Sequence, residues 1–156
     1  VRYGAYYLPW VQAAAETYDV PILLLFSVIY QESRFQAYVK SSAGAQGLMQ
    51  LMPATAAQIA SEINYPPNFS EEDLVVPLYN LMLGTNYLSR QLHVFDGDIY
   101  AALAAYNSGP GNALEWKEIA DDDPDLFLGS VRYLESRDYI RSIAEIFAQY
   151  VRIYCK

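Results

Sequence analysis

The sequence predicts an all-α fold, and three observations support that prediction. Apolar residues recur at helical spacing along most of the chain. No segment alternates apolar and polar residues for long enough to indicate a β-strand. Proline and glycine stand between the periodic segments, at places where they would begin or end helices. We therefore expect a domain built from helices and connecting loops.

In the first half of the chain, proline and glycine mark the helix boundaries. A first amphipathic helix over about residues 5–18 should close before Pro21, which suits the first turn of the next helix. That next helix starts within residues 20–30, an uncharged apolar run that predicts burial on nearly all sides. A loop loosened by glycines follows, and a helix over residues 53–63 then leads into a connection at 64–68.

The second half of the chain is also predicted to be helical. Ser70 followed by Asp73 resembles a capping signal ahead of a long helix. The helices expected here cover residues 78–94, 99–106, about 113–120 and 136–154, with breaks near 96–98, at 108–111 and in the acidic turn 121–125. The last helix should pack through one apolar face made of Ile140, Ile143, Ile146, Phe147 and Val151. We interpret the acidic turn as a solvated loop, because its spacing lacks the glycine and final glutamate of an EF-hand.

Composition and charge narrow the functional classes. The chain has 156 residues, of which 53% are hydrophobic and 18% charged, which fits one globular domain with a real core. The formal charge of −8 repels phosphate backbones and so argues against nucleic acid as a partner. The longest apolar run is too short to span a bilayer. Fifteen tyrosines supply flat faces with polar tips, suited to a core or to a sugar-binding groove.

Cysteine and histidine offer little chemistry. Cys155 is the single cysteine, so no intrachain disulfide can form, and one histidine leaves no His/Cys cluster for a metal. We read His93 as structural, because it lies away from every motif. No cofactor or metal is expected.

The candidate catalytic residue is Glu32, at the C-terminal end of the apolar run. Burial disfavours the charged form of a carboxyl group and raises its pKa, which would let Glu32 donate a proton near neutral pH. The alternative is an exposed carboxylate paired with nearby Arg34. Sequence alone leaves both readings open at this point.

Four segments in order along the chain carry a family resemblance. They are Glu32-Ser33, then Ser41 with residues 44–53 (GAQGLMQLMP), then residues 105–111 (AYNSGPG), and finally residues 135–139 (ESRDY). Together they resemble the catalytic domain of the soluble (SLT) type of lytic transglycosylase, which is related in fold to goose-type lysozyme. The resemblance covers about residues 18–145 and implies a lysozyme-like helical domain with a substrate groove.

The resemblance also implies an activity and a set of site residues. Such an enzyme cleaves the β-1,4 bond between N-acetylmuramic acid and N-acetylglucosamine in peptidoglycan without water, and it leaves 1,6-anhydromuramic ends. Glu32 would be the catalytic acid and base. The residues expected to bind the substrate are Ser33, Ser41, Gln50, Met52, Tyr106, Asn107 and Glu135. Leu48 and Met49 are further candidates for the groove wall, with core packing favoured for Met49.

Several residues keep a structural alternative. Tyr106 could be a core tyrosine whose hydroxyl bonds a backbone carbonyl, and Asn107 could end a helix and cap the turn after it. Glu135 could simply form an ion pair with Arg132, Arg137 or Arg141.

Two other functions fit the same pattern. One is a muramidase that uses water, which would need a second carboxylate facing Glu32. The other is a non-catalytic peptidoglycan-binding or scaffold module. The family further implies a periplasmic or cell-envelope location, peptidoglycan strands as the partner, and room for envelope protein partners. The chain shows no export signal, so any such signal was removed or lies outside it; with the export that the resemblance implies, we expect residues 1–156 to form one catalytic domain cut from a longer exported protein.

Overall fold

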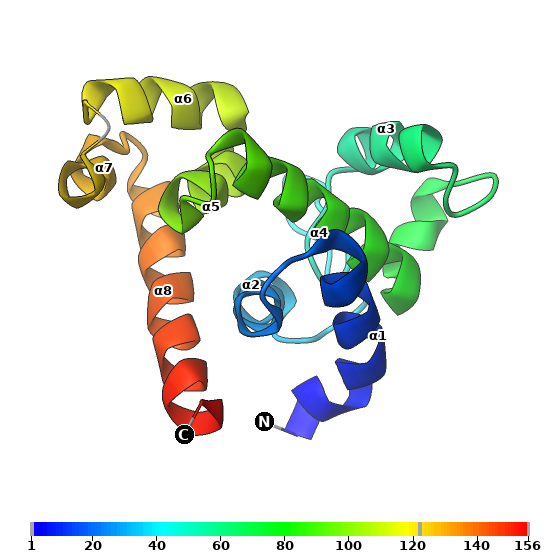
Figure 1. The fold of residues 1–156 in the computed structure, drawn as a ribbon. Helices are drawn as coiled ribbons and strands as arrows, with labels where there is room; N and C mark the ends of the chain where they lie inside the picture. The colour runs from blue at the N-terminus through cyan, green and yellow to red at the C-terminus, as the bar shows by residue number, and fades with distance from the viewer. Residues whose placement is uncertain (1, 122, 156) are drawn as a thin grey trace. The chain divides into compact units, whose positions relative to one another are not determined.

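The described part of the protein consists of helices and connecting loops, as the computed structural model shows (Figure 1). The structure describes residues 2–121 and 123–155. Within these residues the only bridge pairings are isolated ones, between Lys40 and Gln46 and between Gln46 and Leu51. The all-α prediction is therefore confirmed. No helix among the described residues is both long and apolar enough to cross a membrane.

The chain divides into two compact units, Val1–Tyr87 and Leu88–Lys156. The helix α4 (Pro77–Val94) begins in the first unit and ends in the second. The single-domain assignment made from the sequence stays a prediction.

In the first unit, the apolar helix α2 packs against the N-terminal helix. The elements ahead of α4 are α1 (Arg2–Tyr18), α2 (Ile22–Ser33), α3 (Pro53–Ile63) and the 3₁₀ helix η1 (Glu71–Val75). Helix α2 contacts α1, and its side chains Leu24, Leu25, Val28 and Ile29 are almost fully buried. Pro21 directly precedes α2, and α3 has the predicted bounds. The capping signal is confirmed as a Ser70–Asp73 capping box, but the element that it caps is η1.

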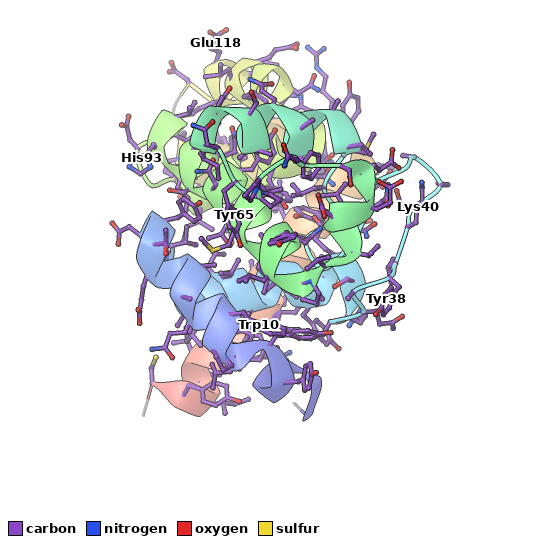
Figure 2. All side chains as sticks on the ribbon, turned by 90° about the vertical axis from the view of Figure 1, so that its right-hand side faces the viewer. Trp10, Tyr38, Lys40, Tyr65, His93 and Glu118 are labelled. Carbon is purple, nitrogen blue, oxygen red and sulfur yellow. The ribbon has the colours of Figure 1, made fainter. Side chains whose placement is uncertain are left out.

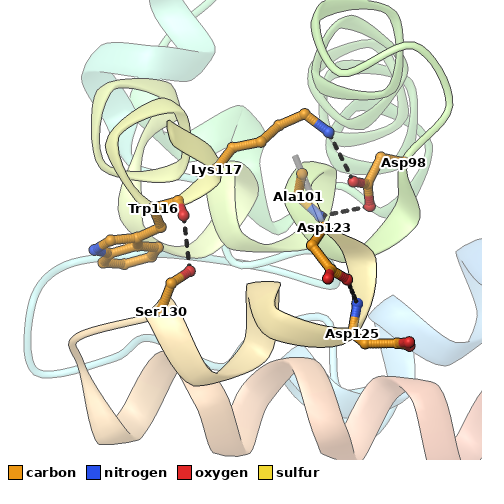
Figure 3. Close-up of polar contacts among 7 residues, drawn as sticks. All are labelled: Asp98, Ala101, Trp116, Lys117, Asp123, Asp125 and Ser130. Carbon is orange, nitrogen blue, oxygen red and sulfur yellow. Dashed lines mark hydrogen bonds and ion pairs between the residues drawn. The ribbon is translucent and has the colours of Figure 1, made fainter. Parts of the chain in front are cut away.

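The second unit contains the alanine-rich helix α5 and the helices around it. Its elements after α4 are α5 (Ile99–Ser108), α6 (Pro110–Ile119), α7 (Pro124–Ser130) and α8 (Leu134–Tyr154). Helix α5 contacts α6, α7 and α8, and its side chains from Ala101 to Tyr106 are all buried. The Asp98 carboxylate accepts a hydrogen bond from the Ala101 N–H and pairs with Lys117, whose Nζ lies 3.1 Å from Oδ2 (Figure 3).

Three sequence predictions about this unit are wrong. The break at 108–111 is limited to Gly109, because Pro110 starts α6 and a proline suits the first turn of a helix. The acidic turn is not wholly a loop, since Pro124 starts α7 and the Asp123 carboxylate caps it by accepting from the Asp125 N–H (Figure 3). Asp122 lies outside the described residues. On α8, Ile140 and Ile143 are buried as expected, but Val151 is exposed.

Candidate active site

Glu32 lies on the last turn of α2, where its side chain is half-buried. The helix ends one residue later, at Ser33, because Arg34 and Phe35 both adopt left-handed backbone conformations, with φ of 53° and 62°. The Arg34 guanidinium lies 4.1 Å above the centre of the Tyr30 ring. The apolar helix α2 therefore places Glu32 directly before the irregular segment 34–52.

Ser33 joins the end of α2 to that irregular segment. Its hydroxyl is buried and can donate to the Leu48 carbonyl at 2.8 Å or to the Ile29 carbonyl at 3.1 Å. A buried hydroxyl engaged in this way holds the loop beside Glu32. We therefore assign Ser33 a positioning contact, and the substrate contact expected from the sequence stays a prediction.

Asn80 fixes the turn that carries Gln50, and sequence reasoning missed it. Its side chain is fully buried on α4. The amide nitrogen donates to the carbonyls of Gln46 and Leu74, both at 2.9 Å, and the amide oxygen accepts from the Met49 N–H at 2.8 Å. A polar residue inside an apolar helical stripe was the available signal, because a buried amide must find partners.

Gly47 allows the close approach between this turn and Asn80. It adopts φ of 82°, and a Cβ atom added here would lie 2.2 Å from both the Asn80 amide nitrogen and the Leu74 carbonyl oxygen. Gly84 has a similar relation to Met49, whose sulfur would lie 2.6 Å from an added Cβ. Glycine is therefore required at both positions by the packing of the chain.

The side-chain amide nitrogen of Gln50 donates its hydrogen bonds within the loop. Nε2 donates to the Val39 carbonyl at 2.9 Å and to the Gly47 carbonyl at 3.0 Å. An amide nitrogen has two hydrogens, so both are used internally, and only Oε1 is left to accept from a ligand. The substrate contact expected for Gln50 is therefore one in which its amide oxygen accepts a hydrogen bond.

The other candidate residues near Gln50 differ in the exposed fraction of their side chains. Met52 is 43% exposed and can contact a ligand, whereas Leu48 and Met49 are fully buried. Leu48 and Met49 are therefore core residues, which confirms the core packing favoured for Met49 and makes the expectation that Leu48 lines a groove wrong. Packing explains this outcome, since Met49 lies against Gly84 and accepts a contact from the Thr85 hydroxyl at 3.7 Å.

Ser41 closes a small loop ahead of the turn. Its hydroxyl accepts from the Ala45 N–H at 3.0 Å, and its own N–H donates to the Ala45 carbonyl at 2.9 Å. The side chain is half-buried. At the edge of this segment Lys40, which projects outward in Figure 2, pairs with Glu71 at 3.3 Å.

In the second unit, hydrogen bonds join the segments 105–111 and 135–139. The side-chain amide oxygen of Asn107 accepts from the Ser136 hydroxyl at 2.8 Å and from the Ser108 hydroxyl at 3.1 Å. The two hydroxyls are 2.6 Å apart. Asn107 therefore connects the end of α5 to the start of α8. This contact is structural, but it differs from the turn cap expected from the sequence. Tyr106, one residue earlier, is buried on α5.

Glu135 lies exposed on the first turn of α8. Arg132 pairs with Glu115 at 3.0 Å. Arg137 donates to the carbonyls of Val131 and Gly129, at 2.6 and 3.0 Å. Two of the three arginines considered as partners for Glu135 are thus engaged elsewhere, which weakens the plain ion-pair reading.

The remaining candidates for chemistry are peripheral. His93 is exposed at the end of α4 (Figure 2), and its Nδ1 lies 2.9 Å from the Ser89 carbonyl. Cys155 is exposed near the C-terminus. Among residues 2–121 and 123–155, no group of three or more His, Cys, Asp or Glu side chains could hold a metal ion.

Comparison with known proteins places this arrangement in a family. The chain is 32% identical over 139 residues to a putative soluble lytic murein transglycosylase of Haemophilus influenzae. It is 32% identical over 134 residues to the soluble lytic murein transglycosylase of Escherichia coli. These alignments cover 88% and 85% of this chain but only 23% and 21% of the relatives, so the chain spans less than a quarter of their length.

Solved structures agree with this fold. The lytic transglycosylase Slt from Pseudomonas aeruginosa, an inactive mutant, matches with a TM-score of 0.87 at 29% identity. The match covers 98% of this chain and 25% of that one. A complex of a 70-kDa soluble lytic transglycosylase with bulgecin A matches with a TM-score of 0.91 at 28% identity, over 97% of this chain and 25% of that one. The family model described as "Transglycosylase SLT domain" matches residues 9–126, and the chain therefore belongs to that family.

Proposed function

We propose that this chain is the catalytic domain of a peptidoglycan lytic transglycosylase. The observation that carries the proposal is the placement of Glu32, in a chain of the SLT family, half-buried at the end of an apolar helix beside an internally fixed loop. Ser33 and Asn80 hold that loop through buried hydrogen bonds. A carboxyl group held beside a rigid wall can serve as a positioned general acid and base.

Glu32 first donates its proton to the glycosidic oxygen, and the bond from that oxygen to the anomeric carbon breaks. The positive charge that develops on the anomeric carbon is met by the N-acetyl oxygen of the same sugar, a form of substrate assistance. The Glu32 carboxylate then takes the proton of the C6 hydroxyl while that oxygen bonds to the anomeric carbon. Glu32 ends protonated, no water is consumed, and the product is a 1,6-anhydro sugar.

The other residues have narrower parts in this proposal. Met52 contacts the sugar, and the Gln50 oxygen accepts a hydrogen bond from it. Ser41 keeps its substrate-binding assignment, as do Tyr106, Asn107 and Glu135 of the second unit. A glutamate-to-glutamine mutant is described as inactive for the Pseudomonas aeruginosa neighbour, which supports a single essential carboxyl group. We place the chain in the periplasm or cell envelope, where its substrate and any protein partners would be.

The test is the isosteric variant Glu32→Gln, which removes the proton donor and keeps the shape. Turnover of purified sacculi should nearly vanish, whereas Glu118→Gln, a change at an exposed glutamate on α6 (Figure 2), should leave it unchanged. Mass spectrometry of the products decides the reaction type, because the anhydro end is lighter by one water than a reducing end. Substantial turnover by Glu32→Gln would refute the catalytic role, and reducing-end products would identify a hydrolase.

A further inference from the structure

A pocket lies on the first unit between one face of α3 and the loop that follows it. Its volume is about 470 Å³, within the range of small-ligand sites. It is lined by Ala57, Ala60, Ser61, Asn64, Pro66, Pro67, Asn68 and Phe69. None of the residues assigned to the proposed catalytic machinery belongs to this set.

The lining is neutral and divides into an apolar and a polar part. Ala60 and Pro66 are buried, with Phe69 half-buried, and they offer apolar contact surface. Ser61, Asn64 and Asn68 are exposed, and their side chains make no hydrogen bond within residues 2–121 and 123–155. The polar groups are thus available to a ligand, while the absence of charge among the lining residues disfavours an ionic one.

Asn64 and Asn68 both occupy left-handed backbone positions. Asn64 ends α3, with its N–H donating to the Ala60 carbonyl, and it has φ of 52°. Asn68 has φ of 56°. Each amide offers both a donor and an acceptor, which can pair with the C=O and N–H of a secondary amide.

Helix α3 also connects the pocket to the proposed active site. It starts at Pro53, directly after the exposed Met52, and at 100° per residue positions 53, 57, 60 and 64 share one face. A rise of about 1.5 Å per residue puts the pocket roughly 6 to 17 Å along the helix from its start. An extended peptide spans about 3.3 Å per residue, so two to five residues would bridge that distance.

We propose that this pocket binds a secondary amide flanked by a methyl group on the peptidoglycan substrate, an inference that rests on the proposed function. Two parts of the polymer carry this chemistry, the alanyl residues of the peptide stem and the N-acetyl groups of the glycan. The methyl group packs on Ala60 and Pro66, and the amide pairs with Asn64 and Asn68. Such binding adds affinity away from the bond that is cleaved.

The binding test uses the Glu32→Gln chain, so that no turnover occurs. Nuclear magnetic resonance follows the side-chain amides of Asn64 and Asn68 during titration with a capped, uncharged alanyl dipeptide and, separately, with chitotetraose. Shifts caused by the dipeptide identify the stem as the source, and shifts caused by chitotetraose identify the glycan. If neither probe moves these resonances, the proposal is overturned.

Two variants sharpen the test. Ala57→Leu fills the pocket from its exposed rim, and the double change Asn64→Gly, Asn68→Gly removes both amides while glycine accepts the left-handed backbone without strain. Binding to both variants is followed through backbone amide resonances, because the double change removes the side-chain amides. The double change should weaken probe binding by about fivefold to tenfold, the size expected for losing one or two hydrogen bonds, and Ala57→Leu should weaken it by occupying the pocket. Gln58→Leu is the control, because Gln58 is exposed on the same helix and does not line the pocket. Unchanged binding in the two variants would contradict the assignment.

Kinetics separate this proposal from the proposed function. If the chain cleaves sacculi, the two pocket variants should raise KM and leave kcat unchanged, as expected for a contact remote from the reacting bond. If the chain cleaves nothing, the proposed function fails while the resonance titration still decides whether the pocket binds. A fall in kcat with KM unchanged would contradict the pocket's role.

Discussion

Replacing Asn80 tests whether one buried amide holds the loop beside Glu32. Its side chain is inaccessible to solvent and satisfies three backbone groups, the carbonyls of Gln46 and Leu74 and the N–H of Met49. Asn80→Leu keeps a similar side-chain volume and removes the amide group that makes these three hydrogen bonds. All three backbone groups would then remain buried without a hydrogen bond.

The expected cost follows from that count. Leaving a buried donor or acceptor unsatisfied costs about 1 to 3 kcal/mol, so three such groups lower the free energy of unfolding by at least about 3 kcal/mol. For a chain of this length each kcal/mol corresponds to about 2 to 4 °C in Tm. We therefore expect Asn80→Leu to melt about 6 to 12 °C lower, measured by circular dichroism on heating.

Asn86 on the same helix provides the matched control. It is half-buried, and its amide oxygen is enclosed without a hydrogen-bond partner. Asn86→Leu removes a polar atom that already lacks compensation, so it should change stability by less than about 1 kcal/mol or increase it. Equal losses in the two variants would show that any leucine at this depth of α4 is destabilising, and the hydrogen-bond account of Asn80 would then fail.

Two further changes probe the same unit by thermal unfolding. Gly47→Ala should cost more than about 3 kcal/mol, because the new Cβ meets two polar atoms at 2.2 Å, whereas Gly44→Ala, with φ of 95° and open space, should cost only about 1 kcal/mol. Equal costs would refute the steric argument. Burial raises the pKa of Tyr87 above its ordinary value of about 10, so its neutral form favours the folded state, and stability is lost as pH rises past 10. Tyr87→Phe should reduce that alkaline loss, and parallel pH profiles would contradict this reasoning.

Helix boundaries were predictable where the residue at the boundary is typical of only one kind of local structure. Helix α3 begins at Pro53 and ends at Ile63, directly before Asn64, and its bounds match the prediction. The pair Pro110-Gly111 misled because it is typical of turns as well as of the first turn of a helix, and the structure uses the latter. Helix α7, Pro124–Ser130, was missed because seven residues are too few to show a 3.6-residue period.

The structure shows the contacts that the candidate residues make within the chain, whereas their membership of the substrate site stays a prediction. Motif order selected Glu32 and Gln50, which the structure places at a helix end and in a left-handed turn. The hydrogen bonds that hold this turn come from Asn80, some thirty residues along the chain, and no local pattern encodes such a pairing. Burial likewise separates Met52 from Met49, although both occur in the same short motif.

The loop beside Glu32 is held by backbone hydrogen bonds, such as that from the Gly47 N–H to the Val39 carbonyl, and by hydrogen bonds from side chains. Between residues 34 and 52 the regular pairing is limited to the two isolated bridges among the described residues. Buried backbone groups need hydrogen-bond partners, and Ser33, Gln50 and Asn80 supply partners to the carbonyls of Leu48, Val39 and Gln46 in this loop. A change at Gln50 would therefore displace the loop as well as remove a ligand contact, because its donors serve the backbone. In this unit the exposed Met52 is the candidate groove residue whose side chain is most directly available to a substrate.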